Sequence, residues 1–301
     1  MKAFQIFSDS SCDLPDSLQK EHAIKIVPFY VSFNHNTYYK ENIDISKEAF
    51  YEQLASPDTY STTSMPTVQD YIYEFKQALK NNFNLICLCL SHKLSGSYQS
   101  AVNAKHILEE QYPDSEIQII DSLQATGGQG VLLLQIAYMK EAGLSLGEIV
   151  EKLELLKQTS RIMFTVNTLE YLIKGRRIGK VVALADNMLE LNPLIQLKSA
   201  ELIPYSSVRG RKKSLDQIFS MTEEYFMETG EKPDDYDFVI ASATTLEDAL
   251  YLQKRVEDFT GNKITYPIFQ IGVTIGTYIG PGGIGICFVK KYNCVGICEA
   301  I

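Results

Sequence analysis

The amino-acid sequence predicts an α/β protein built from two domains, and three observations lead to this prediction. Short apolar runs alternate with longer amphipathic stretches, which is the pattern of strands connected by helices. The run at residues 85–90 is apolar throughout, as expected of a strand buried on both faces of a sheet. Successive elements are joined by short connections, which favours a parallel sheet covered by helices on both sides. The length of 301 residues suffices for two domains with separate cores.

The first half, residues 1–160, is expected to form a Rossmann-like parallel sheet with helices on both faces. Apolar positions recur at helical spacing in several stretches, for example at Tyr71, Ile72, Phe75 and Leu79. The helices are predicted at residues 46–55, 67–81, 98–111, 130–142 and 146–158. The strands are predicted at residues 3–7, 85–90 and 116–120, with one or two more within residues 24–33.

The second half, residues 161–301, is expected to form an α/β domain with more antiparallel character. Its predicted helices are residues 169–173, 180–189, 212–229 and 245–259. Its predicted strands are residues 162–166, two near 193–208, and residues 238–243, 268–274 and 284–290.

Charge and composition argue against several classes of function. The formal net charge of −9 disfavours a nucleic-acid surface, although residues 209–213 form one basic run. No stretch reaches the roughly 18 apolar residues of a spanning helix, and the first residues do not resemble a secretory signal. We therefore expect a cytoplasmic protein.

Two glycine-rich segments resemble nucleotide-binding motifs without the required context. Residues 280–285 satisfy G-x-G-x-x-G but lead into a predicted strand rather than a helix, so a tight turn near a ligand or a domain seam is expected. Residues 175–180 resemble a phosphate loop, but one residue is missing between the glycines and Val181 replaces the required Ser or Thr. The four histidines lack metal-binding spacing, so we expect no cofactor and no metal.

Hydroxyl groups and glycines collect where predicted strands lead into helices, at residues 8–11, 62–66, 91–97 and 121–128. Ligands bind at this edge of a parallel sheet, where helix N-termini point free N–H groups outward. Thr63 and Ser64 precede Pro66, which suits a first helical position, and Ser95 precedes Gly96, which lets the backbone approach a ligand. These groups are expected to bind a small anion. The alternative is that each hydroxyl only caps its own helix.

Two aspartates leave open the possibility of an enzyme. Asp9 and Asp121 each end a predicted strand beside a serine, and either could serve a phosphotransferase or hydrolase as a catalytic carboxylate. An aspartate in this position also fixes loops through backbone N–H groups, which is the favoured role here. His92 could touch a ligand in the turn of residues 91–97, but a lone loop histidine is more often only solvated.

The ordered set of motifs resembles the DegV family, which includes the fatty-acid-binding subunits of bacterial fatty acid kinase. The resemblance rests on residues 8–10 with Asp13 and Leu14, and on residues 63–66, 94–101, 121–122 and 280–282. It implies two α/β domains with an acyl chain in a tunnel between or beneath them. It also implies that the hydroxyls of Thr63 and Ser95, with N–H groups around Ser64 and Gly96, bind the fatty-acid carboxylate.

The resemblance further implies a carrier that is not an enzyme on its own. A separate ATP-dependent kinase subunit would phosphorylate the bound carboxylate to an acyl phosphate. The partners are then one long-chain fatty acid and the kinase subunit, with no nucleic acid and at most transient membrane contact. A lipid-dependent sensor or adaptor is a second alternative, beside an enzyme that uses Asp9 or Asp121.

Three positions relate this chain to the family pattern in detail. The family usually has His-Thr where this chain has Tyr278 and Ile279, so either Tyr278 donates the hydrogen bond or the site is altered. Arg177 keeps the arginine of a family turn, with Arg176 as an additional cation. Arg209 and Arg211 match a stretch associated in the family with kinase docking and phosphoryl transfer, and Arg177 is grouped with them.

Overall fold

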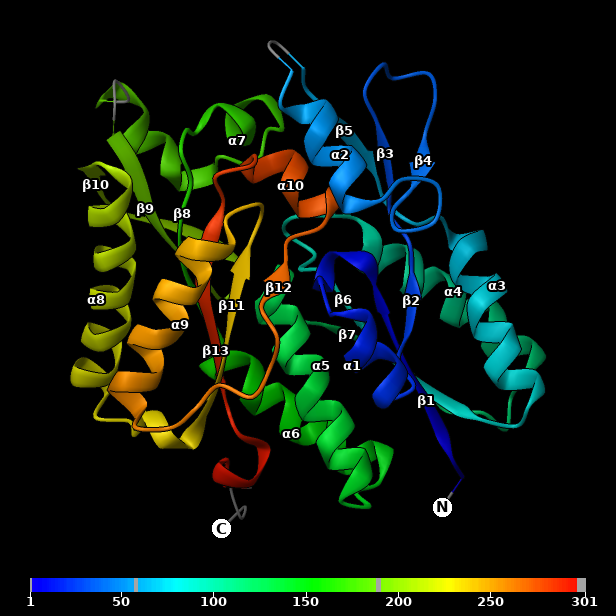
Figure 1. Ribbon diagram of the computed structural model, residues 1–301. Helices are drawn as coiled ribbons and strands as arrows, with labels where there is room; N and C mark the ends of the chain where they lie inside the picture. Colours follow the sequence, from blue (N-terminus) through cyan, green and yellow to red (C-terminus); the bar gives the residue numbers. More distant parts are fainter. Residues whose placement is uncertain (1, 57–58, 188–190, 297–301) are drawn as a thin grey trace.

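The computed structural model describes residues 2–56, 59–187 and 191–296, without the side chains of residues 185–187. It confirms the predicted α/β class, with a parallel sheet in the first half and a largely antiparallel sheet in the second (Figure 1). Among these residues, no helix combines the length and the apolar character needed to cross a bilayer.

The first sheet is parallel and is covered on both faces. Its strand order is β2-β1-β6-β7, with β1 (Phe4–Asp9), β2 (Lys25–Val27), β6 (Asn84–Cys89) and β7 (Ile117–Asp121). Leu85 and Cys87 of β6 pack in the core under α3 (Val68–Lys80) and α4 (Ser97–Gln111), whereas Ile86 and Leu88 pack against α5 (Thr126–Glu141). Successive residues of a strand point to opposite faces, so this apolar run needs a core on each side, as predicted.

A three-stranded antiparallel sheet lies apart from the parallel one and corrects one prediction. Its order is β4-β3-β5, with β3 (Tyr30–Ser32), β4 (Tyr39–Lys40) and β5 (Thr62–Ser64). Thr63 and Ser64 therefore lie in a strand and not in a turn at the edge of the parallel sheet. Pro66 does not open the next helix either, because Thr67 is the N-cap of α3 and forms a capping box with Asp70.

The second large sheet has six strands in the order β10-β9-β8-β13-β11-β12. Only β11 and β12 pair in parallel; the other pairs are antiparallel. The strands are β8 (Arg161–Thr165), β9 (Leu191–Lys198), β10 (Glu201–Arg209), β11 (Tyr236–Ser242), β12 (Phe269–Gln270) and β13 (Ile284–Lys290). Helices α8 (Arg211–Thr229) and α9 (Leu246–Thr260) cover one face of this sheet, while α5 and α6 (Leu146–Thr159) cover the other face.

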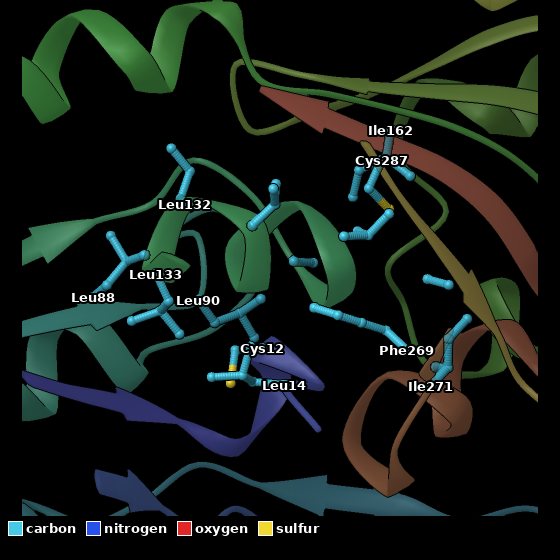
Figure 2. Close-up of a cluster of buried hydrophobic side chains, with 14 of the residues drawn as sticks. Cys12, Leu14, Leu88, Leu90, Leu132, Leu133, Ile162, Phe269, Ile271 and Cys287 are labelled. Carbon is cyan, nitrogen blue, oxygen red and sulfur yellow. The ribbon is translucent and has the colours of Figure 1, made fainter. Parts of the chain in front are cut away.

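Helix α5 lies between the two large sheets and packs on both. Glycines at its start permit this close approach: a Cβ on Gly127 would lie 2.9 Å from Cys287 Sγ, and one on Gly130 would lie 2.7 Å from the Cys12 carbonyl oxygen. Figure 2 shows the resulting core, in which Leu88, Leu132 and Ile162 belong to one apolar cluster. Because α5 and α6 pack against strands that follow residue 160, the boundary at that residue stays a prediction.

The strand predicted at residues 268–274 is wrong beyond Gln270. Strand β12 ends there, and α10 (Val273–Ile279) begins after Gly272. Buried carboxylates from the first half accept hydrogen bonds from the amides that open α10, from Gly272 N to Asp13 at 2.8 Å and from Thr274 N to Glu41 at 3.1 Å. These partners are more than 200 residues away in the chain, so the local β-branched pattern could not indicate a helix.

The remaining elements are short. The helix predicted at residues 180–189 is a 3-10 helix over Gly179–Asn187, and residues 188–189 lie outside the described residues. The other short elements are η1 (Ser10–Cys12), α1 (Asp16–Glu21), α2 (Lys47–Leu54), α7 (Glu170–Lys174), η3 (Pro233–Asp235) and η4 (Tyr292–Cys294).

Candidate functional site

An apolar cavity of about 340 Å³ lies where the three sheets, α7 and α10 meet. This volume falls in the range of about 300–1,000 Å³ typical of small-molecule sites. Its walls come from segments distant in sequence, among them Phe29, Leu90, Thr126, Ile162, Phe164, Leu197, Ala241, Ile271 and Ile279. Most of these side chains are buried, so the interior of the cavity is screened from solvent.

The five predicted ligand-binding residues all line this cavity, at its polar end. They are Thr63, Ser64, Ser95, Gly96 and Tyr278. Thr63 Oγ1 lies 2.7 Å from Tyr278 Oη, which links β5 to α10. Ser64 and Gly96 are exposed and the other three are partly buried, so this end forms the mouth of the cavity.

The start of α4 leaves N–H groups at the mouth. Gly96 is its N-cap and provides no side-chain hydrogen bond, in contrast to Ser46, Thr67 and Ser145, which cap α2, α3 and α6. The Ser95 hydroxyl accepts a hydrogen bond from Ser97 N at 3.2 Å. The Ser95 hydroxyl thus occupies the first amide of α4, while the amides of Tyr98 and Gln99 have no hydrogen-bond partner among the described residues and lie at the positive end of a 15-residue helix. Capping thus involves Ser95 and Gly96, but it does not account for Thr63 or Ser64, which lie in β5.

Arg177 lies at the same mouth and adds a positive charge there. From the sequence, this arginine was expected to serve kinase docking or phosphoryl transfer. Its Nε donates to the Leu94 carbonyl at 3.1 Å, its Nη1 donates to the Gly175 carbonyl at 2.9 Å, and its guanidinium is 5.2 Å from the centre of the Tyr278 ring. Arg177 also lines a second cavity of about 240 Å³ beside the first. Lys93, Arg176 and Lys180 lie on that second cavity.

Arg209 and Arg211 do not reach the main cavity. Arg211 pairs with Asp248 at 2.7 Å and donates to the Gly282 carbonyl at 2.8 Å, so it ties the start of α8 to α9 and to the glycine-rich turn. Arg209 is exposed at the end of β10. Residues 280–283 form the turn between α10 and β13, which agrees with the expected tight turn.

Asp9 and Asp121 fix loops, as favoured from the sequence. Asp9 is fully buried and accepts hydrogen bonds from Leu90 N at 2.9 Å and from the Ser97 hydroxyl at 2.7 Å. Burial raises the pKa of Asp9 despite these bonds. Asp121 accepts hydrogen bonds from the backbone N–H groups of His92 and Leu123, and its carboxylate also contacts His92 Nδ1. Neither aspartate nor His92 lines the cavity.

Two buried carboxylates lie behind the cavity: Asp13, which the sequence marked only as part of a family motif, and Glu41, which was not predicted. The Thr126 hydroxyl donates to Asp13 at 2.6 Å and the Thr274 hydroxyl donates to Glu41 at 2.6 Å. Both threonines line the cavity, so the carboxylates satisfy hydroxyls that would otherwise be unpaired polar groups at an apolar wall. Burial, with a further contribution from Glu41, raises the pKa of Asp13 to about 7, while Lys47 opposes the rise. Nothing local in the sequence marks Glu41.

Comparison with known proteins agrees with this fold. A family model described as "Uncharacterised protein, DegV family" matches residues 3–291. This chain belongs to the DegV family. A DegV domain-containing protein from Clostridium perfringens is 32% identical over 297 residues, covering 96% of this chain and 98% of the relative. The protein DegV of Bacillus subtilis is 28% identical over 295 residues, covering 95% and 99%.

Solved DegV-family structures have the same fold. A protein from Eubacterium ventriosum, described as a fatty acid (stearic acid)-binding protein, superposes with a TM-score of 0.92 at 33% identity, covering 97% of this chain and all of that one. A DegV family protein from Thermus thermophilus, described by its fatty acid binding, gives a TM-score of 0.86 at 25% identity, covering 96% and 100%.

Proposed function

We propose that this DegV-family chain binds a single long-chain fatty acid, with its carboxylate at the mouth of the main cavity and its acyl chain inside. The observation that carries this proposal is the polarity of the cavity, which has hydroxyls and free helix amides at one end and buried apolar side chains elsewhere. The stearic-acid-binding relative from Eubacterium ventriosum supports the ligand class.

The energetics suit such a ligand. Each buried methylene contributes about 0.8 kcal/mol, so the acyl chain supplies most of the affinity. The carboxylate must leave bulk water, which is costly without hydrogen bonds. The hydroxyls of Thr63, Ser95 and Tyr278 and the amides that open α4 would supply those bonds, and Arg177 would supply a positive charge nearby.

The carrier would present the bound carboxylate to a separate ATP-dependent kinase subunit, which forms the acyl phosphate in the cytoplasm. The absence of a phosphate-loop sequence and the placement of Asp9 and Asp121 away from the cavity favour a carrier over an enzyme. Arg177 at the mouth, Arg209 at the end of β10 and Arg211 at the start of α8 would form the docking side. The proposal also keeps the predicted boundary between two domains near residue 160.

Native mass spectrometry of the purified protein tests the ligand. The expected spectrum contains a one-to-one complex with a fatty acid, and Thr63→Ala combined with Ser95→Ala should lower its occupancy without changing the circular dichroism. Full occupancy in the double variant would count against the proposed carboxylate site. For the carrier role, the protein with ATP and a fatty acid should form no acyl phosphate until a kinase subunit is added.

A further inference from the structure

The cavity changes from partly exposed to fully buried along its length, and the six-stranded sheet supplies part of its buried wall, beside residues such as Phe29 and Leu90. Met65 at the mouth is 42% exposed, whereas Ala241 on β11 is 1% exposed. A ligand whose charged group stays at the mouth therefore directs its apolar end into this buried part, where the sheet is one of the walls. Which part of the sheet receives that end follows from the register of the strands.

One row of side chains across the sheet contains two very small residues side by side. Ala241 of β11 is opposite Gly285 of β13, and Gly285 is opposite Phe164 of β8. The same row continues to Phe269 on one side and Ile195 on the other. Large side chains therefore flank a methyl group and a hydrogen atom, and the sheet has a shallow trough over its two central strands.

Helix α5 closes the trough on its inner side. The next row along the strands contains Ile162 and Cys287, which lie side by side in Figure 2. A Cβ on Gly127 would lie 2.9 Å from Cys287 Sγ and 3.3 Å from the Cβ of Ala241, so the backbone of α5 already contacts this part of the sheet. Ala241 and Gly285 thus form the floor of the trough, Phe164 and Phe269 form its sides, and α5 closes one end.

We propose that the methyl end of the acyl chain lies in the trough over Ala241 and Gly285, and that the size of residue 241 sets the longest chain accepted. This inference rests on the proposed function and assigns the determinant of chain length within it. The other two small residues on the cavity wall suit this role less, because Gly96 is exposed at the mouth and Ala125 is next to the larger Thr126. Ala241 is also the better position to vary, because a Cβ on Gly285 would lie 2.9 Å from the Met163 carbonyl oxygen.

A chain-length series tests the role of residue 241. Affinities are measured for unbranched saturated fatty acids of increasing length with the wild type, Ala241→Val and Ala241→Gly. Valine adds two carbons, so the longest acid bound well should shorten by about two methylenes, and the affinity for the original longest acid should fall by roughly 15-fold, about fourfold per methylene excluded. Glycine should instead improve the affinity for longer acids relative to shorter ones.

Ala249→Val is the matched control. Ala249 is also a fully buried alanine of the second half, but it lies on α9 in the cluster on the opposite face of the sheet. The same added volume there should leave the length preference unchanged. Equal preferences in the wild type and in Ala241→Gly, or an equal shift in Ala249→Val, would overturn the assignment.

Photolabelling of the wild-type protein tests the location without any substitution. A fatty acid that carries a diazirine at its methyl end is bound, irradiated and mapped by peptide mass spectrometry. Label is expected on peptides containing residues 236–242 or 284–290. Saturable label confined to the segment around Phe29 or around Leu202 would refute the trough while leaving fatty-acid binding intact. Absence of saturable label, together with absence of affinity for every acid in the series, would instead refute the proposed function.

Discussion

The hydroxyl of Tyr278 lies 2.7 Å from that of Thr63, so α10 and β5 meet at the mouth of the cavity. The two residues are 215 positions apart in sequence. The resemblance to the family predicted a histidine at this position. The placement of Tyr278 against Thr63 and beneath the Arg177 guanidinium gives it hydrogen-bonding contact with the predicted carboxylate site.

Replacing Tyr278 by phenylalanine should weaken fatty-acid binding about tenfold or more. The substitution removes one donor, and a hydrogen bond to a charged group contributes about 1.5–3 kcal/mol. Titration calorimetry with a soluble fatty acid gives the affinity. Tyr205→Phe is the control, because Tyr205 bonds to Glu224 at an exposed position away from the cavity, and it should bind normally. Unchanged affinity in Tyr278→Phe would remove Tyr278 from the site.

Gly175→Ala should also weaken binding, although residue 175 does not line the cavity. A Cβ there would overlap the ring of Tyr278, so the ring must shift, which disturbs its contact with Thr63. Gly147→Ala in α6 is the matched control, because a Cβ at Gly147 meets no atom within 4 Å. The control should be neutral or slightly more stable, since alanine favours helices by about 1 kcal/mol. If Gly175→Ala bound fatty acid as tightly as the control, binding would not depend on the present position of the Tyr278 ring.

The buried carboxyl of Asp13 should make the fold less stable as the pH rises from about 4 to 7. Its pKa is about 7 in the folded protein and about 3.9 in an unfolded chain, so the folded state holds the extra proton between these values. The stabilising contribution is therefore complete below about pH 4 and is lost as the pH passes 7, at about 1.4 kcal/mol per unit of raised pKa. Glu41, whose pKa is also raised by burial, acts in the same direction, and Lys47 opposes both.

Urea denaturation at several pH values measures this dependence. Comparison with Asp13→Asn isolates the contribution of Asp13 from that of the other groups, because asparagine keeps the shape and cannot ionise. The variant should lose less stability than the wild type between pH 5 and pH 8. Parallel curves for the two proteins would contradict the prediction.

Arg211→Ala should destabilise the protein even without any kinase. The side chain pairs with Asp248 and donates to the Gly282 carbonyl, and its loss leaves a partly buried carboxylate without its cation. A decrease of about 1–3 kcal/mol in the free energy of unfolding is expected. Lys212→Ala, at an exposed position in the same turn of α8, should change stability by less than about 0.5 kcal/mol. Equal stability in the two variants would show that the Asp248 pair contributes little.

The sequence predicted the elements whose signals are local. The spacing of Tyr71, Ile72, Phe75 and Leu79 indicated α3, and the apolar run of β6 indicated a strand buried on both faces. The start of α10 could not be predicted in this way, because its first amides bind Asp13 and Glu41, which are distant in the chain.

Only part of the site could be predicted, again because contacts between distant segments leave no local signal in the sequence. Thr63 and Ser95 were recognised from family motifs, and both lie on the cavity. The prediction that Thr63 lies at a helix N-terminus was wrong, because Thr63 is in β5 and Thr67 is the N-cap of α3. Arg177 was recognised from a family turn but not as part of the cavity mouth, and Ala241 has no signature of its own, because its position in the trough depends on how distant strands pair.

The position of β13 also determines when the site can exist during synthesis. This strand is late in the chain, yet it lies between β8 and β11 in the middle of its sheet. At about 5–20 residues per second, β8 leaves the ribosome on the order of ten seconds before β13 is made. During that interval, the edge of β8 that later pairs with β13 has no partner, and Gly285 is absent from the cavity wall. A nascent chain can therefore form the parallel sheet early, but the wall that the proposed acyl chain would contact is complete only after β13 has been made.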